Sequence, residues 1–162
     1  MTWAHMGVAD DLTTQGKKFH GADRPGAVSV ELEVPFHDVD AMGLVWHGHY
    51  YKYLELARTA LFRARGLDIG SLIGRRFRFV MIESGCRYTA PLHYGDRVQV
   101  SAWLRDLKHR IYIQYEAINL TSGKRVARAH TVLASTDRSG RMLLQTPDEI
   151  IKSLDQVDEG RA

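Results

Sequence analysis

A short polar segment, residues 37–49, gathers the carboxylate and imidazole side chains that could do chemistry in this chain. Carboxylates and imidazoles serve as nucleophiles, general bases or metal ligands in proteins. The spacing Asp38-Val39-Asp40 before a helix is, taken alone, more typical of a turn or a helix N-cap, because short carboxylates accept backbone N–H bonds there. His37, Asp38, Asp40, His47 and His49 match no familiar metal motif, so we expect no metal site. Spacing alone therefore leaves both turn formation and catalysis open.

A second polar group, Lys108-His109-Arg110, lies at a corner between two expected strands. Charged residues at such a corner usually form a solvated hairpin turn. Adjacent cationic and hydrogen-bonding side chains also suit contacts with phosphate oxygens. Both interpretations of this basic corner remain open from the residues alone.

The elements that must position these groups follow from the hydrophobic pattern. Apolar residues alternate with polar ones from Val28 to Phe36, which predicts a strand with one buried face. Apolar residues then cover a broad arc from about Gly48 to Arg65, which predicts a largely enclosed helix ending at Gly66. A last helix is expected to begin at Pro147. Short turns imply antiparallel pairing of four further strands, at Phe79 to Tyr88, Arg97 to Leu107, Arg110 to Leu120 and Lys124 to Thr136.

Length and composition restrict the class of protein. The 162 residues fit one domain, and 44% apolar and 25% charged residues are typical of a folded chain. No run approaches the ~20 apolar residues that span a bilayer, and no secretory signal precedes the first strand, so we expect a cytoplasmic protein. A net charge of +3 without a clustered basic stripe argues against nucleic-acid binding, and the single Cys86 cannot form an intrachain disulfide.

We divide the chain into a flexible tail at residues 1–26, one folded domain at 27–155 and a C-terminal tail at 156–162. The opening residues 1–5 are left open as native sequence or an addition made for cloning, with Met6 as an alternative start. The element order favours an α+β fold in which an antiparallel sheet wraps around one long central helix.

Two linked segments resemble a known family. Residues 36–47 follow the pattern Asp-x-Asp-x-x-Gly-x-Val-x-His, and residues 50–58 continue it as a Tyr-x-x-Tyr-Leu-Glu-x-Ala-Arg helix. This resembles the hotdog-fold acyl-CoA thioesterases, in particular the branch with 4-hydroxybenzoyl-CoA thioesterase and the Tol-Pal-associated thioesterases. The resemblance extends from about Val28 to Leu154.

This resemblance implies a thioester hydrolase in which Asp40 attacks the thioester carbonyl or activates a water. It implies that the backbone N–H of His47, at the helix start, donates to the oxyanion. The His47 side chain could orient water or the acyl group, or only pack at the helix start. Substrate contacts are implied for Gly43, Tyr50, Lys108, His109 and Arg110, the last three with the phosphates of coenzyme A.

The same resemblance implies a homodimer or tetramer acting on an acyl-CoA or acyl-carrier thioester, with a short-chain or aromatic acyl group. We expect no cofactor other than the coenzyme A of the substrate. One rival is a hydratase of the same fold, although no Asn-Pro-x-x-His stretch occurs. Another rival is a non-catalytic acyl-CoA or acyl-carrier binding module.

Overall fold

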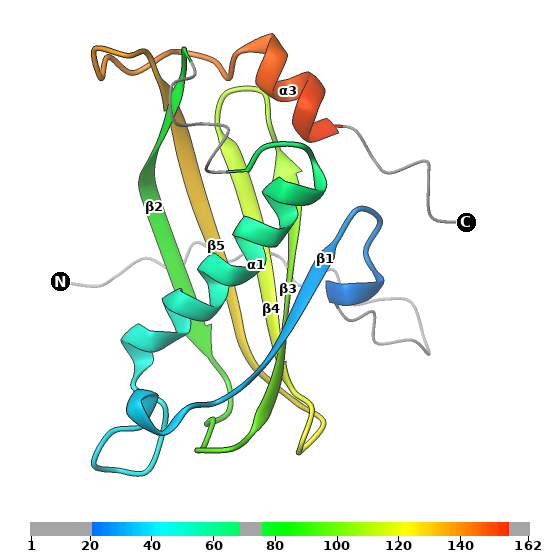
Figure 1. Ribbon diagram of the computed structural model, residues 1–162, viewed down its shortest axis with the longest axis vertical. Coiled ribbons are helices and arrows are strands. Elements are labelled where there is room, and N and C mark those ends of the chain that lie inside the picture. Colours follow the sequence, from blue (N-terminus) through cyan, green and yellow to red (C-terminus); the bar gives the residue numbers. More distant parts are fainter. Residues whose placement is uncertain (1–20, 69–75, 156–162) are drawn as a thin grey trace, which may run out of the picture.

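The computed structural model of the chain describes residues 21–68 and 76–155 (Figure 1). Most of the expected N-terminal tail and the whole expected C-terminal tail, 156–162, lie outside the described residues. Part of the expected N-terminal tail, residues 21–26, is described by the structure. There a 3-10 turn, η1 (Gly21–Asp23), places the buried Gly21 against the Trp103 ring. The N–H of Gly21 donates to the Glu116 carboxylate at 2.5 Å. Residues 21–23 therefore rest on the sheet.

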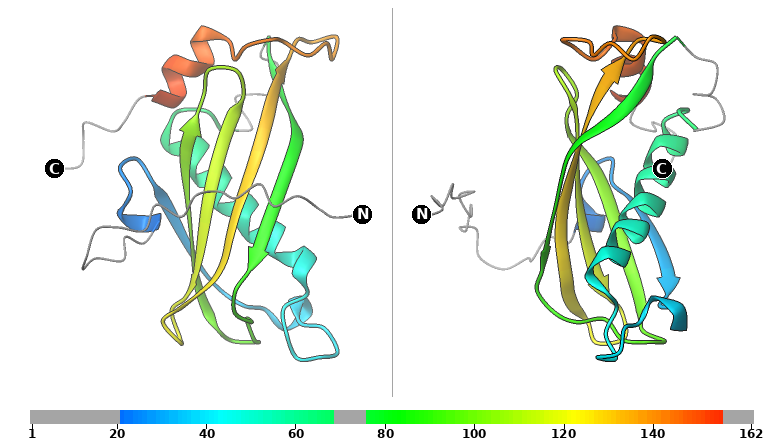
Figure 2. Two further views of the ribbon diagram at one scale, coloured as in Figure 1. Left: turned by 180° about the vertical axis from the view of Figure 1, so that it is seen from behind. Right: turned by 90° about the vertical axis from the view of Figure 1, so that its left-hand side faces the viewer.

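The described residues form a five-stranded antiparallel sheet with one long helix against one face, which confirms the predicted α+β hotdog architecture (Figure 2). The strand order is β1-β3-β4-β5-β2, so β1 and β2 are the sheet edges. The strands are β1 (Val28–Glu33), β2 (Arg78–Tyr88), β3 (Arg97–Asp106), β4 (Ile111–Asn119) and β5 (Lys124–Thr136). Register shifts interrupt the β2–β5, β3–β4 and β4–β5 ladders.

The first strand is shorter than the alternation predicted. β1 ends at Glu33, and Phe36 lies in the 3-10 turn η2 (Phe36–Asp38) with 78% of its surface exposed. Pro35 explains the difference, because proline has no backbone N–H to donate to a neighbouring strand. The chain therefore leaves the sheet just before the polar segment.

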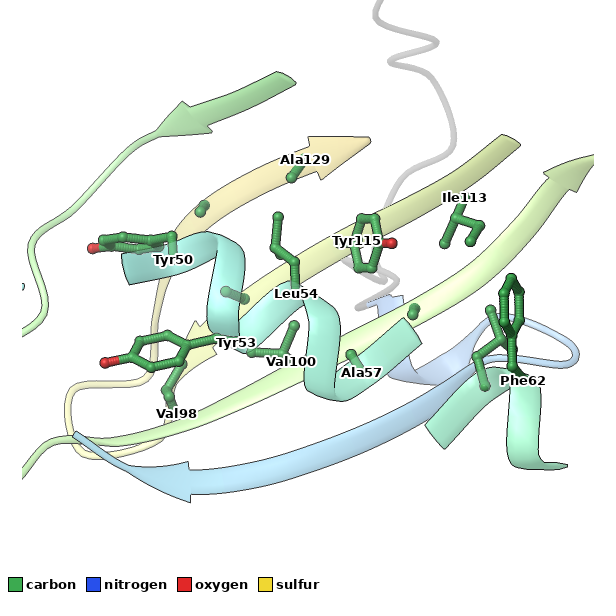
Figure 3. Packing of buried hydrophobic residues seen from close by; sticks show 14 of the residues in the cluster. Tyr50, Tyr53, Leu54, Ala57, Phe62, Val98, Val100, Ile113, Tyr115 and Ala129 are labelled. Atoms are coloured by element: carbon green, nitrogen blue, oxygen red, sulfur yellow. The ribbon is translucent and has the colours of Figure 1, made fainter. Parts of the chain in front are cut away.

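The long helix α1 (Tyr50–Ala64) follows a 3-10 turn, η3 (His47–His49), and lies diagonally across the inner face of the sheet (Figures 1 and 2). The close-up in Figure 3 shows Tyr50, Leu54 and Ala57 facing the side chains of the strands. Gly66 ends this region with φ +70°, a left-handed conformation that favours glycine. The predicted bounds were close, but the buried arc is narrower than expected, because Ala64 is exposed.

A short helix, α3 (Asp148–Asp155), closes the other end of the core with the fully buried Ile150 and Leu154. It begins at Asp148, one residue after the predicted start at Pro147, and the Pro147 carbonyl accepts backbone N–H groups from the first turn of the helix. In the described residues no helix has the length and apolar character needed to span a membrane.

We expect Leu61→Ala to lower the free energy of unfolding by about 2–5 kcal/mol, because Leu61 is fully buried between α1 and the sheet. Denaturant unfolding followed by circular dichroism measures this change. Leu144→Ala is the matched control, since Leu144 is 89% exposed and its truncation should cost less than about 0.5 kcal/mol. Equal losses in the two variants would contradict the placement of α1 over the core.

Candidate active site

The connection between β1 and α1 is a small closed loop at one end of the sheet (Figure 1). Val39 and Val45 pair as an isolated antiparallel bridge, and the N–H of Asp40 donates to the carbonyl of Leu44 at 2.8 Å. Gly43 completes the turn with φ +79°, and its N–H donates to the carbonyl of Asp40 at 2.9 Å. The role of Gly43 in this structure is therefore to turn the chain back towards the helix.

Asp40 lies exposed on this turn. Its Oδ1 atom accepts the backbone N–H of Met42 at 2.8 Å, which is the turn chemistry that the spacing suggested. Its Oδ2 atom has no partner in the described part of the chain. The carboxylate is thus held at one oxygen and available at the other, on a surface that one chain leaves open to water.

Asp38 has the opposite environment, and sequence reasoning gave it no role of its own. Its side chain is 1% exposed and contacts three groups of the helix region. Tyr53 Oη donates to Oδ2 at 2.7 Å, and His49 Nδ1 lies 3.2 Å from Oδ1. Lys52 Nζ forms a short salt bridge with the same oxygen. In the sequence, the sign of this environment was the pair Lys52 and Tyr53, a cation and a hydroxyl at adjacent helix positions. Only the fold shows that both side chains reach Asp38.

The contacts of Asp38 decide its ionisation. Burial opposes the charged form, but hydrogen bonds from Lys52 and Tyr53 and the charge of Lys52 outweigh it and hold the pKa of Asp38 below its ordinary value. Burial and the neighbouring carboxylate raise the pKa of Tyr53 above its ordinary value, so its hydroxyl stays a donor. Asp38 is therefore a charged hydrogen-bond acceptor inside the protein.

The main chain of Asp38 also fixes the far side of the loop. Its carbonyl oxygen accepts the N–H of Trp46 at 3.0 Å and lies 3.0 Å from Nδ1 of His49. This contact turns the His49 ring towards the loop, although its side chain stays 29% exposed. The loop is consequently tied at Trp46, one residue before the start of η3.

The start of η3 presents an amide that suits an oxyanion. The backbone N–H of His47 has no acceptor among the residues that the structure describes, as expected for the first residue of a helical turn. The carbonyl of His47 accepts the hydroxyl of Tyr88 at 2.8 Å, which ties the turn to the end of β2. A Cβ at Gly48 would meet the Trp46 ring, so a larger residue there would displace that half-exposed side chain.

The side chains of the two aromatic site candidates differ in exposure. The His47 ring is exposed, with ring centroids 4.8 Å from Trp46 and 6.4 Å from Tyr88. Tyr50 is 4% exposed and packs edge-on against Tyr88 at 4.8 Å. Burial raises the pKa of Tyr50 to about 12. In a single chain Tyr50 is thus a core residue that supports the helix start, and its predicted contact with substrate stays a prediction.

The basic corner lies at the opposite end of the sheet from Asp40 (Figure 1). The ten residues of β3 between the two ends span on the order of 30 Å. Arg110 Nη1 donates to the carbonyls of His109 at 2.7 Å and Leu143 at 3.3 Å, so part of its guanidinium holds the segment after β5. Lys108 and His109 are exposed. One chain therefore does not bring the basic corner and Asp40 together.

The sequence predicts neither metal nor cofactor. Within residues 21–68 and 76–155, no group of three His, Cys, Asp or Glu side chains is arranged to hold a metal ion. The loop polar groups are instead used in hydrogen bonds to Met42, Trp46, Lys52 and Tyr53.

We expect the stability that Asp38 contributes to be present above pH ~4, the ordinary pKa of an aspartate, and to be lost as the pH falls through its lower folded value. Asp38→Asn should lower the free energy of unfolding at pH 7 by on the order of 3 kcal/mol and flatten its decline in acid. Urea unfolding between pH 2 and pH 7 measures both effects. An unchanged acid slope in the variant would contradict this assignment.

Comparisons with known proteins agree with this fold. The family model for the Thioesterase-like superfamily matches residues 34–154. YneP of Bacillus subtilis, a candidate acyl-CoA thioesterase, is 32% identical over 76 residues, 47% of this chain and 55% of that protein. The acyl-CoA thioester hydrolase YbgC of Escherichia coli O6:H1 is 27% identical over 77 residues, 48% of this chain and 58% of that protein. The matches thus span a little over half of these two relatives.

A solved structure shows the same architecture. The 1,4-dihydroxy-2-naphthoyl-CoA thioesterase of Synechocystis superposes with a TM-score of 0.71 at 20% identity, over 82% of this chain and 98% of that one. At this identity the likeness establishes the fold. Since the family model covers most of the chain, from just after β1 through the loop, α1 and the rest of the sheet to α3, the protein belongs to the Thioesterase-like superfamily.

Proposed function

We propose that this protein is a thioester hydrolase that cleaves an acyl-CoA into a free acid and coenzyme A. Membership of the Thioesterase-like superfamily and the two relatives named for this activity support the reaction class. The observation that carries the site is the closed loop, which joins an exposed carboxylate at Asp40 to an unpaired amide at His47.

The chemistry needs only these two groups and water. Either the Asp40 carboxylate attacks the carbonyl carbon, or it takes a proton from a water that attacks. The carbonyl oxygen becomes an oxyanion, which the His47 N–H and the positive end of α1 stabilise. The C–S bond then breaks and the thiolate leaves, which requires little help from an acid because a thiolate is a good leaving group. When water attacks, this step yields the free acid directly. When Asp40 attacks, it leaves a mixed anhydride on Asp40, which a water then hydrolyses to the free acid and the free carboxylate. Both routes for Asp40 remain part of the proposal.

A second copy of the chain would complete the site. In one chain Asp40 is open to water, and the neighbouring Phe36 and Met42 are 78% and 82% exposed. A hydrolase that controls which nucleophile reaches its substrate normally encloses the reacting groups. The basic corner is also too distant to contact a substrate held at Asp40 of the same chain. These features support the homodimer or tetramer expected from the sequence, with Lys108, His109 and Arg110 supplied by another copy.

The acyl group proposed is short-chain or aromatic, as in the branch with 4-hydroxybenzoyl-CoA thioesterase and the Tol-Pal-associated thioesterases. The support is the Asp-x-Asp loop that continues into the Tyr-Leu-Glu-x-Ala-Arg helix in one register. Coenzyme A or a carrier protein could present this acyl group. The cytoplasmic location and the absence of a cofactor stay predictions.

The alternative is a non-catalytic module that binds acyl-CoA or an acyl carrier. The exposed position of Asp40 on its turn favours this alternative, because turn formation alone explains the Oδ1 contact. Thiol release from a panel of aromatic, short and long acyl-CoAs, followed with a thiol-reactive dye, separates the two. Saturable binding without any thiol would establish the module and exclude the hydrolase.

We expect Asp40→Asn to lower kcat by about 10²- to 10⁴-fold, because the variant keeps the turn contact of Oδ1 but loses the negative charge. Steady-state thiol release measures the change. Asp137→Asn is the matched control, since Asp137 Oδ1 accepts the N–H of Ser139 at 2.9 Å in a turn of the same kind, far from the loop. Near wild-type turnover by Asp40→Asn would exclude Asp40 as the catalytic group.

We expect Lys108→Ala to raise KM for acyl-CoA by about 2- to 5-fold, with little change in kcat, since an exposed ion pair contributes at most about 1 kcal/mol. The same acyl group on a short thiol without phosphates is the control substrate, and its KM should not change. Equal effects on both substrates would contradict a phosphate contact at the basic corner.

A further inference from the structure

The buried Asp38 carboxylate has a position that packing does not explain. It lies two residues before Asp40, is 1% exposed and keeps a negative charge in the protein interior. An ion pair in such a place adds little net stability compared with apolar side chains of similar volume. A buried charge does, however, hold its partners in a defined direction, because each hydrogen bond to it is strong and geometrically demanding.

The partners of Asp38 come from both sides of the proposed site. Tyr53 and Lys52 belong to the first turn of α1, so the carboxylate attaches the loop to the helix. The Asp38 carbonyl accepts the Trp46 N–H, which lies immediately before the His47 amide. Asp38 is followed by Val39, which pairs with Val45 in an isolated bridge. The position of Asp38 therefore sets where the turn at Asp40 begins.

We infer that Asp38 is a positioning residue, which holds the Asp40 carboxylate and the His47 amide in the mutual geometry that thioester cleavage needs. This inference rests on the proposed function and names a residue for which that proposal has no role. Asp38 does not itself contact substrate, because its oxygens are enclosed and directed at Lys52, Tyr53 and His49.

The consequence is a selective effect on turnover. Loss of the charge leaves Tyr53 and Lys52 with a weaker acceptor and lets the loop shift relative to α1. A displacement of about 1 Å at a reacting group costs up to ~10²-fold in rate. The basic corner at the other end of the sheet is untouched, so substrate binding through it should persist.

Asp38→Asn and Tyr53→Phe are the test variants, and each should lower kcat by about 10- to 100-fold with KM changed less than about threefold. Tyr115→Phe is the matched control, because Tyr115 is 1% exposed and its hydroxyl bonds Thr131 Oγ1 at 2.8 Å, away from the loop. Tyr115→Phe removes a buried tyrosine hydroxyl, as Tyr53→Phe does, and the kcat of this control variant should stay within about threefold of wild type. Thermal unfolding of each variant confirms that the measured protein is folded, and Tyr53→Phe carries the test if Asp38→Asn does not fold.

The decisive measurement is a double-mutant cycle with Asp40→Asn. If Asp38 acts through the mutual geometry of Asp40 and the His47 amide, the loss in the double variant Asp38→Asn/Asp40→Asn should be clearly smaller than the product of the two single losses. Additive losses would show an independent effect and overturn the inference, as would near wild-type kcat in Asp38→Asn and Tyr53→Phe, or an equal loss in Tyr115→Phe. Failure of the proposed function has a different signature, which is full activity in Asp40→Asn itself.

Discussion

The contact between the Asp38 carboxylate and the first turn of α1 is the interaction on which the proposed site depends. A charged oxygen that is removed from water must find donors, and here the donors are Tyr53 and Lys52, with His49 Nδ1 3.2 Å from Oδ1. Because these donors and the carboxylate lie on opposite sides of a loop, satisfying the charge closes the loop. The geometry of Asp40 and the His47 amide is thus a consequence of burying a neighbouring residue.

The two aspartates of the Asp-x-Asp pair show how one residue type takes two roles. Asp38 is enclosed and has a lowered pKa, whereas Asp40 lies exposed on a turn with one oxygen available. The intervening Val39 pairs with Val45 and separates the two environments. The hydrogen bonds of the Asp38 carboxylate are filled, whereas Asp40 keeps one oxygen available. Such a pair can hold a reactive oxygen in place without a cation that would neutralise its charge.

The loop that carries Asp40 and the basic corner lie far apart within one chain. The loop and the basic corner occupy opposite ends of β3, and the apolar side chains of Phe36 and Met42 remain uncovered. In the proposed homodimer or tetramer, another copy of the chain supplies the basic corner that faces this loop. Such an arrangement would enclose the reacting groups and recognise the phosphates of the substrate with the same interface.

The amino-acid sequence by itself determined the order and approximate bounds of the strands and of α1, because burial on one face imposes a period of two or 3.6 residues that is visible in the chain. It also located the loop that carries Asp40, since polar residues between two strongly patterned elements have few other places to lie. β1 ends before Pro35, because proline has no backbone N–H to donate to a neighbouring strand. The alternation of apolar residues ran past this point and did not show the end of the strand. The tertiary structure alone decided that Asp38 is buried and Asp40 exposed, that the His49 ring turns towards the loop and that the basic corner is remote. These facts depend on contacts between residues 11 to 33 positions apart in the chain, and local spacing does not contain that information.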